Sequence, residues 1–173
     1  QDYQIYGATL AENVLMDEVE VGDRERILEA LKQADFEKRL LRLPDGLDTN
    51  MTREFREDGT MLSGGEAQKV AIARMFVRTG KQFLAILDEP SSALDPLAEY
   101  QLNTNMMKNA GDAAVIFISH RLSTTRDADR IYMFENGRII EQGSHQELMR
   151  LGGKYAAMFE KQAYYYQDEI AAC

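Results

Sequence analysis

Cysteine, proline and tryptophan are scarce in this 173-residue sequence, which has one cysteine, three prolines and no tryptophan. Because the single cysteine, Cys173, is the last residue, the chain can form neither an internal disulfide nor a cysteine-based metal site. No apolar run approaches the roughly 20 residues that a membrane-spanning helix needs. These shortages exclude a disulfide-stabilised scaffold and a helical membrane span within the sequence.

Positive charge is also in short supply, since the formal net charge is -9 and no segment is rich in lysine or arginine. A nucleic-acid-binding surface needs concentrated basic residues, so the composition argues against one. A nucleotide could still be bound through backbone amides and Mg²⁺. The chain begins with Gln1, in what reads as a structured pattern, and we expect it to be a piece of a longer protein.

The most informative stretch is an apolar run at residues 83–87 that ends in two adjacent carboxylates, Asp88 and Glu89. Its length and the proline that follows predict a strand buried on both faces of a parallel sheet. Neighbouring side chains of a strand point to opposite sides, so the two carboxylates should have different roles. One could hold a metal ion while the other faces a water, an arrangement that suits phosphoryl transfer. Alternatively, acidic residues end the strand simply because the chain leaves the core.

A second apolar run, residues 113–119, ends at His120. Between the two runs, Asp95 and Pro96 predict the start of a helix that extends to about Lys108. A strand, helix, strand order predicts a right-handed parallel crossover, which would place Asp88, Glu89 and His120 at one edge of the sheet. Otherwise, His120 is a solvated loop residue.

Helix starts are marked by serine or threonine followed three residues later by glutamate, at Thr9, Ser63 and Ser144. Asp23 is expected to cap another helix, so the first third of the chain should be mostly helical. The Ser63-Gly64-Gly65 run leaves backbone N–H groups open to an anion, unless the glycines only form a tight loop.

The C-terminal part of the sequence predicts a hairpin followed by helices. Two short apolar segments, residues 131–135 and 138–141, flank Asn136-Gly137, a pair typical of a two-residue hairpin turn with positive φ. Helical segments are expected after Ser144 and over residues 154–167.

Taken together, these motifs closely resemble the ATP-binding cassette of ABC transporters, in particular of exporters. The resemblance covers nearly the whole chain. It identifies Gln1 as the Q-loop glutamine, Leu62–Glu66 as the signature motif and Leu84–Glu89 as the Walker B strand with its catalytic glutamate. It also identifies Ser92–Asp95 as the D-loop and His120 as the switch histidine. It implies an α/β, partial P-loop NTPase fold. Residues 1–78 would form the Q-loop and helical subdomain, and residues 79–173 the RecA-like portion with a β-hairpin and C-terminal helices.

The resemblance also implies roles, with ATP and Mg²⁺ as cofactors. Glu89 would be the general base, His120 would contact the γ-phosphate, and Asp88 and Gln1 would serve the Mg²⁺ ion. The implied partners are a second nucleotide-binding domain in a head-to-tail dimer and a transmembrane domain at the cytoplasmic face of the membrane. In that dimer, nucleotide held by the opposite subunit would be gripped by Ser63, Gly64, Gly65 and Asp95.

Three departures from the cassette pattern stand out. The phosphate-binding pattern G-x-x-x-x-G-K-[ST] is absent, so the chain as given should bind ATP weakly and hydrolyse it negligibly. Residues 56–59 read Arg-Glu-Asp-Gly where exporters usually read Gly-Glu-Arg-Gly. Glu66 stands where glutamine is commoner.

Two alternative functions stay open at this point: a non-transport cassette ATPase of DNA repair or translation, and a non-enzymatic module with the same fold. The missing phosphate-loop strand would leave residues 113–119 with an open edge. We therefore expect the chain alone to be marginally stable or to self-associate.

Overall fold

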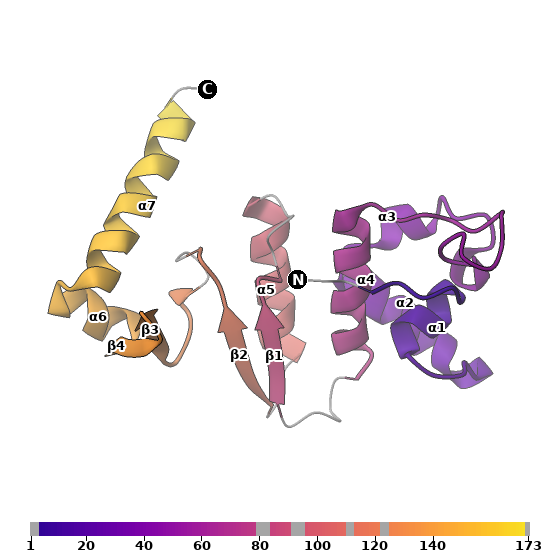
Figure 1. Cartoon of the computed structure of the whole chain (residues 1–173), viewed down its shortest axis with the longest axis horizontal. Helices are drawn as coiled ribbons and strands as arrows, with labels where there is room; N and C mark the ends of the chain where they lie inside the picture. The colour runs from indigo at the N-terminus through magenta and orange to yellow at the C-terminus, as the bar shows by residue number, and fades with distance from the viewer. Residues whose placement is uncertain (1–3, 79–83, 91–95, 110–112, 122–124, 172–173) are drawn as a thin grey trace. The chain divides into compact units, whose positions relative to one another are not determined.

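A computed structural model describes residues 4–78, 84–90, 96–109, 113–121 and 125–171 (Figure 1). The chain forms two compact units, Gln1–Ile118 and Ser119–Cys173. The first unit contains α1 (Leu10–Leu15), α2 (Arg24–Gln33), α3 (Glu37–Leu40), α4 (Gly64–Phe76), β1 (Leu84–Asp88), α5 (Pro96–Asn109) and β2 (Ala114–Ile118), with short 3₁₀ turns at Val21–Asp23 and Gly46–Asp48. The second unit contains β3 (Ile131–Glu135), β4 (Arg138–Gly143), α6 (His145–Leu151) and α7 (Lys154–Ala171).

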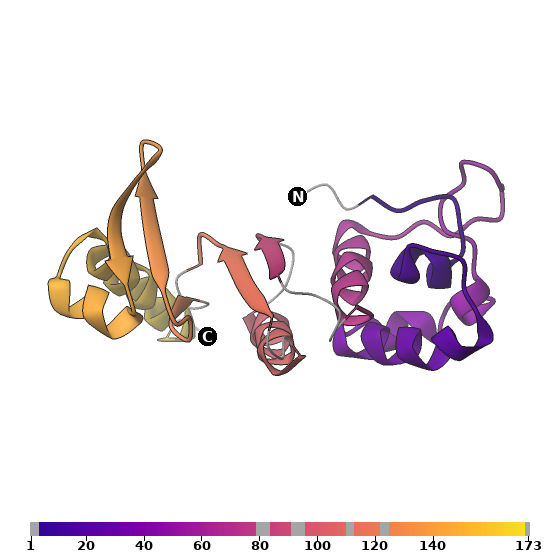
Figure 2. The same ribbon diagram turned by 90° about the horizontal axis from the view of Figure 1, so that it is seen from below.

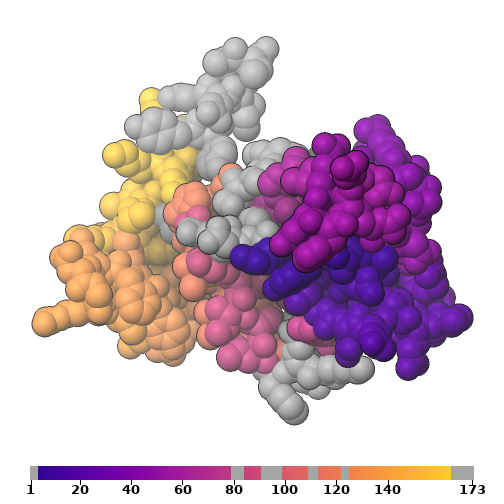
Figure 3. Space-filling model, turned by 45° about the vertical axis from the view of Figure 1, so that its right-hand side comes forward, coloured from indigo at the N-terminus to yellow at the C-terminus, as the bar shows by residue number. Residues whose placement is uncertain are grey.

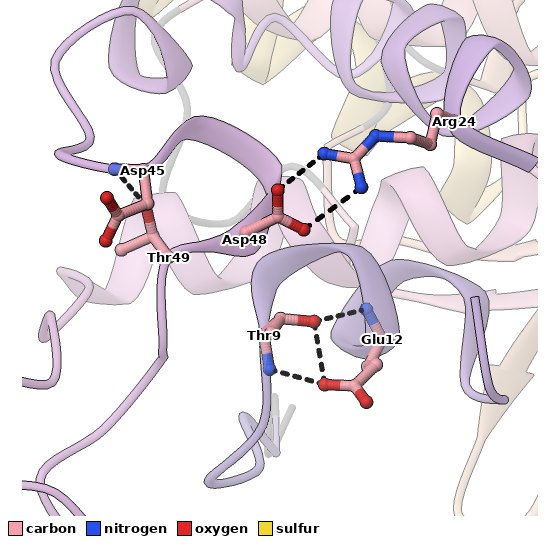
Figure 4. Close-up of polar contacts among 6 residues, drawn as sticks. All are labelled: Thr9, Glu12, Arg24, Asp45, Asp48 and Thr49. Carbon is pink, nitrogen blue, oxygen red and sulfur yellow. Dashed lines mark hydrogen bonds and ion pairs between the residues drawn. The ribbon is translucent and has the colours of Figure 1, made fainter. Parts of the chain in front are cut away.

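Capping boxes begin α1, α4 and α6, as the sequence predicts. At α1, Thr9 Oγ1 accepts a hydrogen bond from the Glu12 backbone N at 3.2 Å, and Glu12 Oε2 accepts one from the Thr9 backbone N at 2.8 Å (Figure 4). Each box satisfies two N–H groups that a helix start would otherwise leave unpaired. Local sequence spacing therefore fixes where these three helices begin.

The predicted cap of α2 by Asp23 is wrong. Asp23 has helical dihedrals, φ -83° and ψ -22°, because a 3₁₀ turn runs directly into α2, and a capping side chain requires an extended backbone. Its carboxylate instead accepts from the Glu20 backbone N at 3.1 Å and pairs with Arg26 at 2.8 Å. The start of α2 is tied to the 3₁₀ turn at Gly46–Asp48 by a two-pronged contact from Arg24 to Asp48 (Figure 4).

Helices α1, α2 and α4 enclose the main hydrophobic core of the first unit, as the predicted helical first third requires. Figure 3 shows the surface of this part of the chain in indigo to magenta. Its fully or almost fully buried apolar residues include Leu10, Val14, Ile27, Leu31, Phe36, Val70 and Ala73. Apart from Phe36, which directly precedes α3, these residues recur at helical spacing along α1, α2 and α4, so each of the three helices turns one apolar face inward.

Strands β1 and β2 are parallel neighbours, with Leu84 opposite Ala114 and Asp88 opposite Ile118. Helix α5 connects them, which confirms the predicted strand, helix, strand order. Leu87 and Phe117 lie on the face of the sheet that packs against the main core. Helix α5 contributes two buried residues, Leu102 and Met106, to that core.

The opposite face of this sheet is open, so the prediction of a strand buried on both faces is wrong for this chain. Leu84 and Ile86 of β1 are 50% and 62% exposed, and Ile116 and Ile118 of β2 are 48% and 51% exposed. A strand is buried on both faces only when a second layer covers it. In the part of the chain that the structure describes, no second layer covers these side chains.

The second unit is built on the predicted hairpin. Asn136 and Gly137 have φ of 48° and 74°, the positive values that this two-residue turn requires, and β3 and β4 pair antiparallel. The hairpin stands beside α6 and α7 (Figure 2), and Ile131 packs with Leu148 and Tyr155 in a small second core.

No helix in the described ranges is both long and apolar enough to cross a membrane. The functional division expected at residue 78 stays a prediction.

Candidate functional site

The first part of the candidate site is the start of α4. Ser63 has the extended conformation of an N-cap, and its Oγ accepts from the Glu66 backbone N at 3.3 Å. The first amides of a helix have no partner within the helix, so those of Gly64 and Gly65 are available to an anion. A Cβ placed at Gly64 would meet nothing within 4 Å, so the space around this residue is open to a ligand. The geometry fits a bound phosphate group.

The second part is the end of β1, where Asp88 is exposed and Glu89 is half-buried. The two neighbouring carboxylates differ in exposure, but the extended backbone predicted for the pair is wrong, because β1 ends at Asp88. Glu89 has φ of 47°, a left-handed conformation that costs a residue with a side chain about 1–2 kcal/mol. Its backbone N donates to the Ile118 carbonyl at 2.9 Å, which holds this turn against β2.

Gln68 connects the two parts and was not predicted from the sequence. It lies on α4, one turn after the capping box, and is fully buried. Its Nε2 donates to the Pro90 carbonyl at 2.8 Å, so a side chain of the helix fixes the turn that contains Glu89. A glutamine inside an otherwise apolar helix face is the only sequence signal for this contact, and that signal does not reveal the partner.

His120 follows β2 and belongs to the second unit. It comes two residues after Ile118, which is the register partner of Asp88. Its side chain is exposed, and its carbonyl accepts from Gln162 Nε2 of α7 at 2.9 Å. The structure thus holds the backbone at His120 through α7.

Two of the predicted site residues, Gln1 and Asp95, lie outside the described residues. Among the residues that are described, no group of three or more His, Cys, Asp or Glu side chains is placed to hold a metal ion. Within the first unit, the hydrogen bond from Gln68 to Pro90 joins α4 to the turn that follows Asp88.

Residues 2–92, just over half of the chain, match the sequence model of the family described as ABC transporter. The chain belongs to the ABC transporter family. The cassette resembles the ATP-dependent lipid A-core flippase of Legionella pneumophila (strain Lens), with 37% identity over 164 residues, which are 95% of the chain and 27% of the flippase. It is also 38% identical to the ATP-binding cassette sub-family B member 6 of Xenopus tropicalis, over 94% of the chain and 18% of that protein.

A solved structure supports the same assignment. A bacterial Atm1-family ABC exporter with ATP bound matches 92% of the cassette chain and 27% of its own chain, with a TM-score of 0.76 and 36% identity. This match confirms the predicted fold class, a partial P-loop NTPase fold with a helical part and a parallel sheet. The chain spans about a quarter of the length of the flippase and of this exporter.

Proposed function

We propose that this chain is part of the ATP-hydrolysing cassette of an ABC exporter, in which ATP hydrolysis drives transport across a membrane. The observation that carries the proposal is that one compact unit has both an open helix start at Ser63–Gly65 and the carboxylate turn at Asp88–Glu89, the two features that a head-to-tail dimer would bring to one nucleotide. The names of the relatives, a flippase and an exporter, favour transport over DNA repair or translation. Because the chain spans only about a quarter of their length, the remainder of a longer polypeptide would supply the transmembrane part.

Each candidate residue has a proposed role. Glu89 removes the proton from the attacking water, and His120 contacts the γ-phosphate. Asp88 and Gln1 hold Mg²⁺, which when bound neutralises phosphate charge. Proton removal by a general base such as Glu89 typically accelerates a reaction by about 10²–10⁴-fold. The strained backbone at Glu89 supports its assignment, because strain is retained where a side chain must be held in one direction.

The start of α4 would act on nucleotide bound by a second cassette in a head-to-tail dimer. Ser63 Oγ and the amides of Gly64 and Gly65 would bind phosphate oxygens there, and Asp95 would lie at the same interface. Residues 1–78 would form the subdomain that receives the transmembrane partner, at the cytoplasmic face of the membrane. Residues 79–173 would form the catalytic portion with the C-terminal helices.

The isolated chain should be inactive. It lacks the G-x-x-x-x-G-K-[ST] loop, whose amides and lysine hold the β- and γ-phosphates in P-loop proteins. Activity tests therefore require a polypeptide that contains such a loop together with this chain.

The test of the proposed function is Glu89→Gln in the complete polypeptide. The amide cannot accept the proton, so steady-state ATP turnover should fall by about 10²-fold or more while ATP stays bound. Turnover and retained nucleotide are measured on the same sample. Glu37→Gln, an exposed site on α3, is the matched control and should keep wild-type turnover. Unchanged turnover in Glu89→Gln would exclude Glu89 as the base.

A further inference from the structure

Glu66 places a negative charge beside the proposed phosphate-binding end of α4. It is the third residue of the helix, and its Oε2 accepts from the Ser63 backbone N at 2.8 Å. A carboxylate in this position stabilises the helix, because it faces the positive end of the helix dipole. The same charge would repel a polyphosphate that approaches Ser63, Gly64 and Gly65. The negative charge of Glu66 therefore stabilises the helix start but opposes phosphate binding at the same place.

Arg39 of α3 contacts the other oxygen of this carboxylate. Its Nε lies 2.9 Å from Glu66 Oε1, an ion pair without hydrogen-bond geometry, and the two side chains are only 28% and 30% exposed. An ion pair that is mostly shielded from solvent is screened less by salt than one on the open surface. The cation on the next turn of α4, Lys69, is engaged elsewhere, since its Nζ lies 2.6 Å from Asp35. Arg39 is thus the cation assigned to Glu66.

We propose that Arg39 is a positioning residue that neutralises Glu66 and keeps the start of α4 able to accept the phosphates of a nucleotide. The proposal rests on the proposed function, because it concerns the same phosphate-binding site. Arg39 and the Ser63 backbone N each contact one carboxylate oxygen, so both oxygens of the glutamate are engaged within the first unit. When Arg39 is paired with Glu66, the two side chains together carry no net charge.

The test is a set of variants in the complete polypeptide, assayed for ATP turnover. Arg39→Ala should raise the KM for ATP about tenfold, the order expected for one uncompensated charge near a polyphosphate, with kcat changed less than twofold. Arg39→Lys keeps the charge and should stay close to wild type. The double variant Arg39→Ala/Glu66→Gln should have a KM within twofold of Glu66→Gln alone, because the charge that needs a partner is gone. Lys38→Ala removes one exposed cation from the same helix and should leave KM unchanged.

Each other result overturns the inference in a recognisable way. If the wild type hydrolyses ATP and Arg39→Ala has an unchanged KM, the inference fails and the proposed function stands. If Arg39→Ala raises KM but Glu66→Gln does not restore it, Arg39 acts through the fold and not through charge. If the wild-type polypeptide neither binds nor hydrolyses ATP, the proposed function itself fails, and the inference falls with it. Thermal melts of each variant identify one that does not fold, in which case Arg39→Lys and the double variant decide.

Discussion

At the scale of single residues, short polar contacts decide where helices start. Glu12 shows the energetic consequence, because its carboxylate accepts hydrogen bonds from both the side chain and the backbone of Thr9. These bonds favour the ionised form and lower the pKa of Glu12 from its ordinary value of 4.5. A carboxyl whose pKa is lower in the folded state contributes stability that is present above pH 4.5 and lost as the pH falls through the folded-state pKa.

The effect of replacing Glu12 on the free energy of unfolding should therefore depend on pH. Glu12→Gln should lower the free energy of unfolding by about 0.3–1 kcal/mol at pH 7, because the charge at the helix N-terminus is lost. The difference from wild type should shrink as the pH falls through the folded-state pKa of Glu12, because the wild-type carboxyl then takes up a proton and loses its charge. Urea unfolding of the chain at several pH values measures both. Glu18→Gln, at an exposed site, is the control, and an equal pH-independent loss in both variants would contradict the explanation.

At the scale of elements, the bend over residues 52–60 contains one departure from the exporter pattern. Arg56 and Asp58, the two residues that differ from the usual Gly-Glu-Arg-Gly, pair with each other, with Arg56 Nε 3.1 Å from Asp58 Oδ1. Both side chains are well exposed, so the pair adds little stability. What the bend requires is Gly59: a Cβ there would lie 1.6 Å from the Thr52 carbonyl oxygen.

Gly59→Ala should therefore destabilise the chain, because the backbone of the bend must move to admit one methyl group. The expected loss is about 1–3 kcal/mol in the free energy of unfolding, measured in urea. Gly22→Ala is the matched control, since a Cβ at Gly22 would meet nothing within 4 Å and the change should stay within about 0.5 kcal/mol. Similar losses in the two variants would show that crowding against Thr52 is not the cause.

At the scale of the whole molecule, we expect the β1–β2 sheet to govern association in solution, because among the described residues it has only two strands and one uncovered face. Ile86 and Ile116 are register partners and lie on the exposed face. Exposed apolar strands with free ladder edges recruit further strands. The isolated chain should accordingly be marginally stable or self-associate, which sedimentation velocity over a range of concentrations will show.

A lysine at the centre of that face should reduce the association. Ile86→Lys adds a charge where two copies would meet, so the average sedimentation coefficient should fall towards the monomer value. Val21→Lys, at a site 91% exposed and outside the sheet, is the control for added charge and should leave association unchanged. A monomeric wild-type chain with a sharp, reversible thermal transition would contradict the expectation.

The sequence by itself determined the features that depend on neighbouring residues. The structure contains, as predicted, the capping boxes at Thr9, Ser63 and Ser144. It also contains the predicted Asn136-Gly137 turn and the strand that ends at Asp88. Each rests on contacts between residues at a fixed, short spacing, and the same short spacings produced the family resemblance. Asp23 is the exception, because the 3₁₀ turn that it ends gives its backbone a helical conformation, in which its side chain does not cap α2.

Only the tertiary structure decided the contacts between residues far apart in the chain. Gln68 holds the turn after Glu89, Arg39 pairs with Glu66, and one face of the β1–β2 sheet is left open. None of these follows from local spacing, because which side chains meet, and which faces are covered, depends on how α3, α4, β1 and α5 pack together. The residue types needed for the proposed chemistry can be read along the chain, whereas their partners are set by packing.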